Sequence, residues 1–370
     1  MLSVDWFRIR HVLLRRIRYK VTRGGVLFTL AVVLVAFAAV ASANNLLFLI
    51  LATMLSTLMV SGLVSRLCLA GLELDFLVPE HVAAGRTIPA KLYVRNLKFW
   101  MPSLSIQVVG VDQGAPPVLQ SPVYFPVIPG GATLEETVQI RFARRGEYRQ
   151  NHFAFHTRFP FGFLEKAARV VLRREVIVYP CIDAQAGFEE LLADLAGEIE
   201  THYRGLGRDF YRIRPYEAFE SARHVDWKAT ARTGELKVRE FAREDERQVV
   251  LVFDPLIFAG AETRVPDAEQ LDRFERGVKL AACLAWHFYE INAEIEFRTE
   301  KLVSPMAPSS ETIWSTMREL ALIQPRVAAP GESLLAQLPE EPHLFKIILT
   351  AQPRGTIPTQ FWTTAYVIFM

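Results

Sequence analysis

Two long apolar stretches near the N-terminus dominate the hydrophobic pattern of the chain. Residues 26–43 and 46–64 are almost wholly apolar and contain no charged side chain. Each stretch is close to the roughly 20 residues that a helix needs to cross a bilayer. Asn44 and Asn45 lie between them and are typical of a tight polar turn. The pattern therefore predicts a transmembrane helical hairpin over residues 26–65.

The charges around this hairpin predict its orientation. Arg66 follows the second stretch, and Asp5 is the only acidic residue before the first. The basic residues before the first stretch are Arg8, Arg10, Arg15, Arg16, Arg18, Lys20 and Arg23. By the positive-inside rule, both ends of the hairpin face the cytoplasm. We therefore expect a multi-pass protein of the inner membrane, whose N-terminus and soluble domains are cytoplasmic.

Residues 1–25 form the basic cytoplasmic segment, and their pattern leaves two structures open. One is an amphipathic helix at the membrane interface, and the other is a disordered basic tail. The helix would turn these apolar residues toward lipid: Trp6, Phe7, Val12, Leu13, Leu14 and Ile17.

Two other interpretations fit the apolar stretches less well. Ala41, Ser42 and Ala43 resemble a signal-peptidase site, but the preceding basic segment is long and a second apolar stretch follows at once. A buried hairpin in a soluble core would rarely give two charge-free runs of this length. Membrane insertion is the favoured interpretation.

Residues 72–180 have the period-two pattern of β-strands. Apolar side chains alternate along 88–94 and again along 138–142, and residues 175–180 end the region as a further strand. Turn residues recur at 102, 116–117, 129–131, 146 and 159–162. The spacing predicts an antiparallel, immunoglobulin-like β-sandwich domain over residues 72–180.

Strands and helices alternate after this domain. Residues 181–248 form a connector, with an acidic helix over 184–199 followed by a polar segment. The apolar run 249–253 ends in Asp254 and is typical of a buried parallel strand. We expect further helices at 267–289 and 310–322, and further strands at 293–297, 344–350 and 366–370. This order predicts an α/β domain over residues 249–370, with a parallel sheet covered by helices on both faces.

Composition excludes several classes of function. With 42 Lys and Arg against 40 Asp and Glu in 370 residues, the net charge is +2, so the protein has no general field that attracts nucleic acid. The basic residues of 203–247 are nearly balanced by acidic ones, unlike a groove that follows a phosphate backbone. Cys68, Cys181 and Cys283 are far apart and form no disulfide or zinc pattern.

The most distinctive segment lies in the connector. Residues 207–216 read Gly-Arg-Asp-Phe-Tyr-Arg-Ile-Arg-Pro-Tyr, 223–232 read Arg-His-Val-Asp-Trp-Lys-Ala-Thr-Ala-Arg, and 236–240 read Leu-Lys-Val-Arg-Glu. This signature resembles that of the domain-of-unknown-function 58 family of bacterial membrane proteins. Shorter segments at 145–148, 160–163 and 178–180 also resemble the family's motifs. The chain departs from the pattern where Phe219 and Glu220 replace Gly-Asp, and where Phe159 replaces Asp.

The resemblance implies a fold and a partner. It implies a von Willebrand factor A-like, Rossmann-type fold for the last domain. Members are commonly encoded beside a MoxR-type AAA+ ATPase, and the family has no established catalytic activity. A MoxR-type ATPase is therefore the expected protein partner, beside the lipid bilayer.

A von Willebrand factor A domain would bind Mg²⁺ at the end of its first strand. Such a site uses D-x-S-x-S together with a distant Thr and Asp, because a hard cation needs several convergent oxygens. The corresponding segment here runs from Asp254 to Phe258 without serine, and the later strand ends in Thr350 and Ala351. We therefore expect no metal and no cofactor, and interpret Asp254 as a turn residue of a degenerate site.

The signature offers charged and aromatic side chains for two different roles. Asp226 or Glu220 could act as a general base, with Arg214 or Arg232 as an anion clamp. The simpler interpretation is an ion-pair network held by Trp227, which serves structure or binding. The candidate residues are Arg214, Tyr216, Glu220, Arg223, Asp226, Trp227, Lys228, Arg232, Arg239 and Glu240.

No activated nucleophile or nucleotide-binding loop accompanies these residues in the sequence. We therefore expect a non-catalytic, membrane-anchored interaction or scaffold protein. It would work with a MoxR-type AAA+ ATPase in the assembly or maturation of envelope-associated complexes. The alternative hypothesis is an uncharacterised enzyme that uses Asp226 and the arginine cluster.

Overall fold

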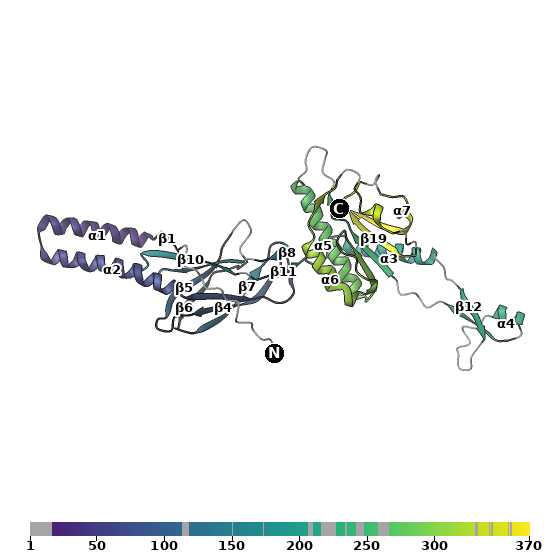
Figure 1. Cartoon of the computed structure of the whole chain (residues 1–370), viewed down its shortest axis with the longest axis horizontal. Coiled ribbons are helices and arrows are strands. Elements are labelled where there is room, and N and C mark those ends of the chain that lie inside the picture. The colour runs from purple at the N-terminus through teal and green to yellow at the C-terminus, as the bar shows by residue number, and fades with distance from the viewer. Residues whose placement is uncertain are drawn as a thin grey trace. The chain divides into compact units, whose positions relative to one another are not determined.

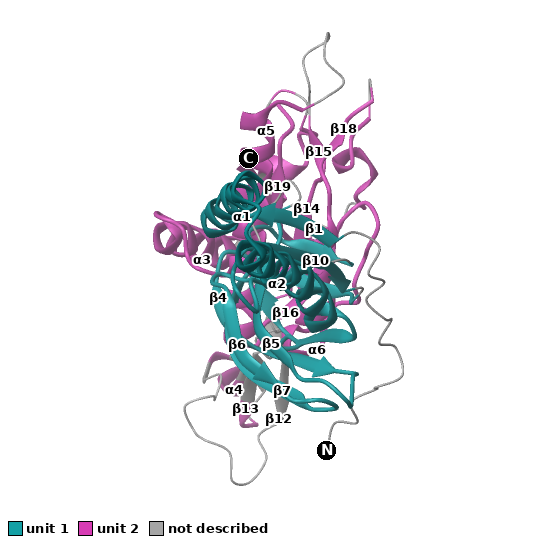
Figure 2. Ribbon diagram, turned by 90° about the vertical axis from the view of Figure 1, so that its left-hand side faces the viewer, with its two compact units in different colours: residues 1–178 teal, residues 179–370 magenta. Residues whose placement is uncertain are grey.

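The computed structural model describes residues 17–370, apart from 113–117, 150, 173, 206–209, 216–226, 234, 242–247, 258–265, 330–331, 340, 342, 354 and 356. The chain divides into two compact units, Met1–Val178 and Tyr179–Met370 (Figures 1 and 2). The division leaves the predicted connector in the second unit.

The first unit begins its described part with a strand and a helical hairpin. Helices α1 (Arg23–Ser42) and α2 (Asn45–Leu69) run antiparallel (Figure 1). Ala43 makes the turn with φ of 51°, and the Asn44 side chain accepts a hydrogen bond of 2.9 Å from the Leu46 backbone N–H. Both helices are long and apolar enough to cross a membrane, with mean hydropathies of 2.5 and 2.3.

The surface of the hairpin is strongly apolar. The buried positions of α1 are Gly25, Val32 and Ala39, so they fall at seven-residue intervals and form one narrow stripe. Exposed apolar side chains occupy most of the remaining surface, among them Leu27, Leu30, Leu34, Phe37, Val40, Leu46, Leu49, Leu55, Met59 and Leu63. Water is therefore an unfavourable environment for this surface.

The rest of the first unit is antiparallel β structure. The largest sheet has the order β1-β10-β9-β5-β6, and a second sheet has the order β2-β4-β7. The strands of the largest sheet are β1 (Ile17–Val21), β10 (Leu164–Leu172), β9 (Asn151–Thr157), β5 (Ser103–Gly110) and β6 (Val123–Ile128). Those of the second are β2 (Leu72–Leu77), β4 (Thr87–Asn96) and β7 (Thr133–Arg141). A third sheet contains β3 (Val82–Ala83), β11 (Val176–Tyr179) and β8 (Gly146–Tyr148).

The predicted alternation produces the core of these sheets. Ala90, Leu92 and Val94 of β4 are buried, as are Val138 and Ile140 of β7. They pack in one cluster with buried side chains of the largest sheet, such as Ile106, Val108, Phe153 and Phe155. Period two thus identified the strands and their buried faces correctly.

Strand β1 corrects the predicted structure of the N-terminal segment. Residues 17–21 are neither part of an interfacial helix nor of a disordered tail, because they pair with β10 in the register Tyr19 to Lys166. The alternation of Ile17, Tyr19 and Val21 with two basic residues was hidden in the basic run. The chain therefore enters α1 directly from a sheet. The other apolar residues assigned to that helix lie outside the described residues.

The start of α1 is attached to the loop between β9 and β10. The Thr22 hydroxyl donates to the Gly162 carbonyl at 2.6 Å, and the Thr22 N–H donates to the Phe163 carbonyl at 3.1 Å. The same hydroxyl accepts the Gly25 N–H at 3.0 Å and so caps the helix. The rings of Phe28 and Phe163 stack with centroids 4.3 Å apart.

The end of α2 is held by a buried lysine. Lys98 has 9% exposure, and its ammonium donates to the Leu67 carbonyl at 2.6 Å, the Cys68 carbonyl at 3.3 Å and the Ser103 hydroxyl at 2.8 Å. The last carbonyls of a helix have no partner within the helix, so a cation there is favourable. Burial nevertheless lowers the pKa of Lys98.

The last turns of α2 contact the sandwich. Cys68 and Leu69 join the sandwich core, and Ser61 and Ser65 are also buried. Lys166 of β10 donates to the Gly62 carbonyl within the helix. The helix therefore extends four residues beyond the predicted end of the hairpin at 65, because the sandwich supplies partners for its last turn.

The second unit is a mixed α/β structure. Its sheet has the order β17-β16-β14-β19-β20, parallel except for β17 at the edge. The strands are β17 (Ala307–Pro308), β16 (Glu294–Arg298), β14 (Gln248–Phe253), β19 (Phe345–Thr350) and β20 (Ala365–Phe369). A short parallel pair, β15 (Leu256–Ile257) and β18 (Arg326–Val327), lies beyond the end of β14.

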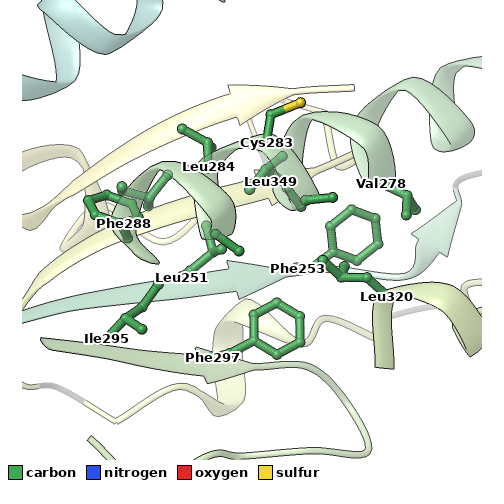
Figure 3. Packing of buried hydrophobic residues seen from close by; sticks show 14 of the residues in the cluster. Leu251, Phe253, Val278, Cys283, Leu284, Phe288, Ile295, Phe297, Leu320 and Leu349 are labelled. Atoms are coloured by element: carbon green, nitrogen blue, oxygen red, sulfur yellow. The ribbon is translucent and has the colours of Figure 1, made fainter. Parts of the chain in front are cut away.

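Both faces of the sheet are covered. Helices α3 (Phe188–Gly205), α5 (Ala268–Glu290) and α6 (Ser309–Leu322) pack on one face. Figure 3 shows Phe253, Phe297 and Leu320 of that layer together. The short helices η3 (Leu335–Gln337) and α7 (Phe361–Thr364) contribute to the opposite layer, around Val250 and Val252. The predicted strands and helices are confirmed to within one or two residues, except for α3, which is shifted toward the C-terminus.

Adjacent glycines at the start of α1 give a matched test of its attachment. A Cβ atom on Gly25 would collide with the Phe163 carbonyl oxygen, whereas one on Gly24 would have its nearest contact at 3.8 Å. We expect Gly25→Ala to lower the free energy of unfolding of the first unit by about 1–3 kcal/mol, because the helix start must move away from the loop. Gly24→Ala should be neutral or stabilising, because alanine favours the helix.

The measurement is chemical denaturation of the full chain in detergent, followed by a probe of the first unit such as hydrogen exchange. Equal effects of the two substitutions would contradict the attachment.

Candidate functional site

The signature segment forms a hairpin and a short helix where it is described. Strands β12 (Phe210–Pro215) and β13 (Lys237–Phe241) are antiparallel, with Arg212 opposite Glu240, Ile213 opposite Arg239 and Arg214 opposite Val238. The structure therefore brings the predicted positions 214, 239 and 240 together on one two-stranded sheet.

Helix α4 (Trp227–Thr233) lies between these strands in the sequence. Trp227 is its first residue, and Lys228 and Arg232 are exposed side chains one turn apart. The Thr230 hydroxyl accepts the Lys237 N–H at 3.0 Å, which ties the helix to the start of β13. Four predicted residues lie outside the described part of the chain: Tyr216, Glu220, Arg223 and Asp226.

A second polar site lies at the carboxyl ends of β14 and β19. When the five strands are numbered by their order in the chain, the sheet has the order 3-2-1-4-5, and β14 and β19 are its first and fourth strands. The crevice between two such neighbouring strands is where α/β folds commonly bind ligands. Asp254 follows β14 and is fully buried. Its carboxylate accepts hydrogen bonds from the Thr350 hydroxyl at 2.7 Å, the Gln352 side-chain amide at 3.1 Å and the Leu256 N–H at 3.1 Å.

Neutral groups therefore occupy the position around Asp254 that a cation could take. Gln352 also hydrogen-bonds the Ser333 hydroxyl at 2.9 Å, so a third loop joins the network. Burial raises the pKa of Asp254 above its ordinary value. The bond to Leu256 closes a turn after the strand, as the sequence predicted, but Thr350 and Gln352 were not predicted as its partners.

An exposed ion-pair network lies on the loops after β16 and around β18. Arg326 contacts Glu300 at 2.9 Å and Glu332 at 2.6 Å, with two donor nitrogens to each carboxylate. The contact with Glu332 is the main cause that raises the pKa of Arg326, and Arg326 lowers the pKa of Glu332. Glu332 is adjacent to Ser333, so this network adjoins the Asp254 site.

A third cluster of charges lies on the sheet itself and was missed by the sequence analysis. Arg298 is buried in β16 and donates to Glu296, and to Glu341 at 3.0 Å. Lys346 of β19 is 1% exposed and donates to the Glu341 carbonyl at 2.8 Å. Burial lowers the pKa of Lys346. These contacts fix the segment before β19 against the sheet.

A metal site depends on clustered ligands, and a reactive thiol depends on an ionised sulfur. Within the described residues, no three His, Cys, Asp or Glu side chains are arranged to hold a metal ion. Cys68 and Cys283 are buried, and burial raises the pKa of Cys283 to about 11, so its thiol stays protonated at neutral pH. The Arg326 network is partly exposed, whereas the Asp254 carboxylate is fully buried and already accepts three hydrogen bonds.

Comparisons with known proteins bear on the second unit. The profile of the family described as "Protein of unknown function DUF58" matches residues 212–340. The matched range begins in β12, includes the signature helix, β14, α5, β16 and α6, and ends before β19. The hairpin and the sandwich lie outside it. No curated protein matches the chain.

One solved structure among those that match is a superoxide reductase (neelaredoxin) variant from Ignicoccus hospitalis. It has 16% sequence identity, with 28% of this chain and 78% of that chain covered, and a TM-score of 0.15. A similarity this low carries no argument about fold or activity.

Removing the Asp254 carboxylate tests whether it organises the strand ends. We expect Asp254→Ala to lower the free energy of unfolding of the second unit by about 3 kcal/mol, because the buried donors of Thr350, Gln352 and Leu256 lose their acceptor. Asp272→Ala, at an exposed position on α5, is the control and should change it by less than about 0.5 kcal/mol. Urea denaturation measures both, and equal effects would contradict a structural role.

The raised pKa of Asp254 also predicts a pH dependence. Its charged form is penalised in the folded state, so this contribution to stability is complete below the ordinary value of 3.8 and is lost as the pH rises through the folded-state pKa. Asp254→Asn lacks this titration. The stability of the natural chain relative to Asp254→Asn should therefore increase as the pH falls from neutral, as urea denaturation at several pH values measures.

Proposed function

We propose that this chain is a non-catalytic interaction protein anchored in the bacterial inner membrane by α1 and α2. The exposed apolar surface of this hairpin carries the proposal, because hydrocarbon is the environment that favours it. The hairpin is attached to the sandwich at both of its ends, so the anchor and the sandwich would move together.

The proposed multi-pass orientation places the sandwich and the second unit in the cytoplasm. Arg23 and Arg66 are exposed at the two helix ends next to the sandwich, and the opposite turn contains only Ala43 and Asn44 between the helices. Positive charge on the sandwich side supports a cytoplasmic location for it. Almost nothing would then reach the outer side of the membrane.

The finer fold assignments belong to this proposal. The antiparallel sheets β1-β10-β9-β5-β6 and β2-β4-β7 support an immunoglobulin-like sandwich. The order β17-β16-β14-β19-β20 supports a von Willebrand factor A-like domain, whose metal site would be replaced by the neutral partners of Asp254. Such a domain would bind its partner through surfaces rather than through a cation.

The proposed partner is a MoxR-type AAA+ ATPase, in the assembly or maturation of envelope-associated complexes. This rests on the resemblance of the signature, which the family match at residues 212–340 supports only as far as a domain of unknown function. Lys228 and Arg232 on α4 are exposed charges of that signature.

Impermeant thiol labelling tests the orientation. In a Cys181→Ser background, we expect Ser42→Cys to react with a membrane-impermeant maleimide in intact spheroplasts, because Ser42 lies next to the outer turn. Val171→Cys, which is exposed on β10, should react only after lysis. Reaction of Val171→Cys in intact spheroplasts would place the sandwich outside.

Affinity purification from solubilised host membranes tests the partner. We expect the full-length chain to enrich an AAA+ ATPase, and the double substitution Lys228→Glu with Arg232→Glu to lose most of it by charge reversal. Lys301→Glu, at an exposed position elsewhere in the second unit, is the matched control and should retain the ATPase. Failure of the natural chain to enrich any AAA+ ATPase would contradict this partner.

A further inference from the structure

Two loops of the sandwich flank the base of the hairpin. The base consists of the start of α1 and the last turns of α2. The loop between β4 and β5 contacts α2, since Lys98 donates to the Leu67 carbonyl at 2.6 Å and the Leu97 N–H donates to the Gly71 carbonyl at 2.8 Å. The loop between β9 and β10 contacts α1 through Gly162 and Phe163. Each helix therefore emerges beside one loop.

Both loops expose aromatic side chains. Phe99 is 87% exposed and Trp100 is 61% exposed in the first loop, and Phe161 is 53% exposed in the second. The ring of Phe161 stacks on Phe163 with centroids 5.5 Å apart, and Phe163 in turn stacks on Phe28 of α1. Stacked rings thus connect Phe161 to α1. We call Phe99, Trp100 and Phe161 the aromatic collar.

Basic side chains accompany the collar. Arg18 and Lys20 are exposed on β1, which leads into α1, while Arg23 and Arg66 are exposed on the hairpin itself. Aromatic rings beside cations are the composition of a membrane–water interface, where rings lie at the headgroup level and cations meet phosphates. Four exposed cations on the two helix ends and on the strand that leads into α1 favour an anionic headgroup layer over a purely apolar protein contact.

The length of the hairpin adds a geometric argument. Ser61, Ser65, Cys68 and Leu69 of α2 are buried, whereas Leu63 and Arg66 are exposed. Residues 45–60 are therefore the part of the helix in which no side chain is buried, and the part that we assign to the membrane. They span about 24 Å at about 1.5 Å per residue, against a hydrocarbon core of about 30 Å. The hairpin has no spare length, so the base must lie at the edge of the hydrocarbon.

We propose that the aromatic collar, with the basic residues beside it, docks the sandwich directly onto the headgroup layer of the cytoplasmic leaflet. The proposal rests on the membrane anchoring proposed above. The collar fixes the depth of the hairpin in the membrane. The largest sheet of the sandwich then lies directly at the membrane surface, without an intervening linker.

Spin-label accessibility in nanodiscs tests this docking. Full-length chains with Cys181→Ser carry one label at Phe99→Cys, Phe161→Cys, Leu34→Cys or Val171→Cys, in phosphatidylcholine mixed with phosphatidylglycerol. All four natural side chains are exposed. Val171 lies seven residues along β10 from Leu164 at the base, or about 24 Å away, and serves as the aqueous control. Labelling of the Cys181→Ser parent measures the background from buried cysteines.

We expect the labels at 99 and 161 to collide with a water-soluble nickel chelate several-fold less often than the label at 171, and with oxygen more often. The label at 34 should report the hydrocarbon interior. If the labels at 99 and 161 match the one at 171 while 34 is in hydrocarbon, the docking is wrong and the anchoring stands. If 34 is aqueous, the anchoring fails and the docking with it. Strong dipolar broadening at 99 together with aqueous accessibility would assign the collar to a second copy of the chain and overturn the proposal.

Discussion

Thr22 and Lys98 attach the two ends of the helical hairpin to the sandwich, and the architecture of the first unit depends on them. Thr22 joins the start of α1 to the loop before β10, and Lys98 supplies donors to the last carbonyls of α2. Each contact satisfies backbone groups that a helix end leaves unpaired. Strand β1 pairs in the sheet directly before α1, and Leu69 at the end of α2 packs in the sandwich core, so the hairpin and the sandwich form one compact unit.

The second unit buries a carboxylate, Asp254, at the carboxyl ends of its strands. A carboxylate at the carboxyl end of β14 lies where α/β sheets bind ligands, but Asp254 is buried and its oxygens are taken by a hydroxyl, an amide and a backbone N–H. Its neighbours Arg326 and Glu300, which are exposed, and Glu332, which is half-buried, neutralise one another in part. A buried carboxylate that accepts three hydrogen bonds holds the ends of β14 and β19 together.

The sequence predicted elements well where one periodicity dominated a long window. The apolar run before Asp254 became β14, the helical spacing after Asp267 became α5, and the alternation in 88–94 and 138–142 became buried faces of β4 and β7. It failed for β1, because a five-residue strand among arginines carries too short a pattern to compete with its charge. The signature was recognised by its residues, yet its pairing of β12 with β13 had no periodic signal that would have revealed it.

The sequence by itself determined the apolar hairpin, the period-two strands and the alternating strands and helices, because these depend on neighbours within a few residues. The tertiary structure alone decided which polar groups meet. Thr22 and Gly162 are 140 residues apart, Lys98 and Leu67 are 31 apart, and Asp254 and Gln352 are 98 apart. Hydrophobic burial is non-directional and can be read from local pattern, whereas a hydrogen bond needs two particular atoms in contact. Only the folded arrangement of strands and helix ends brings those atoms together.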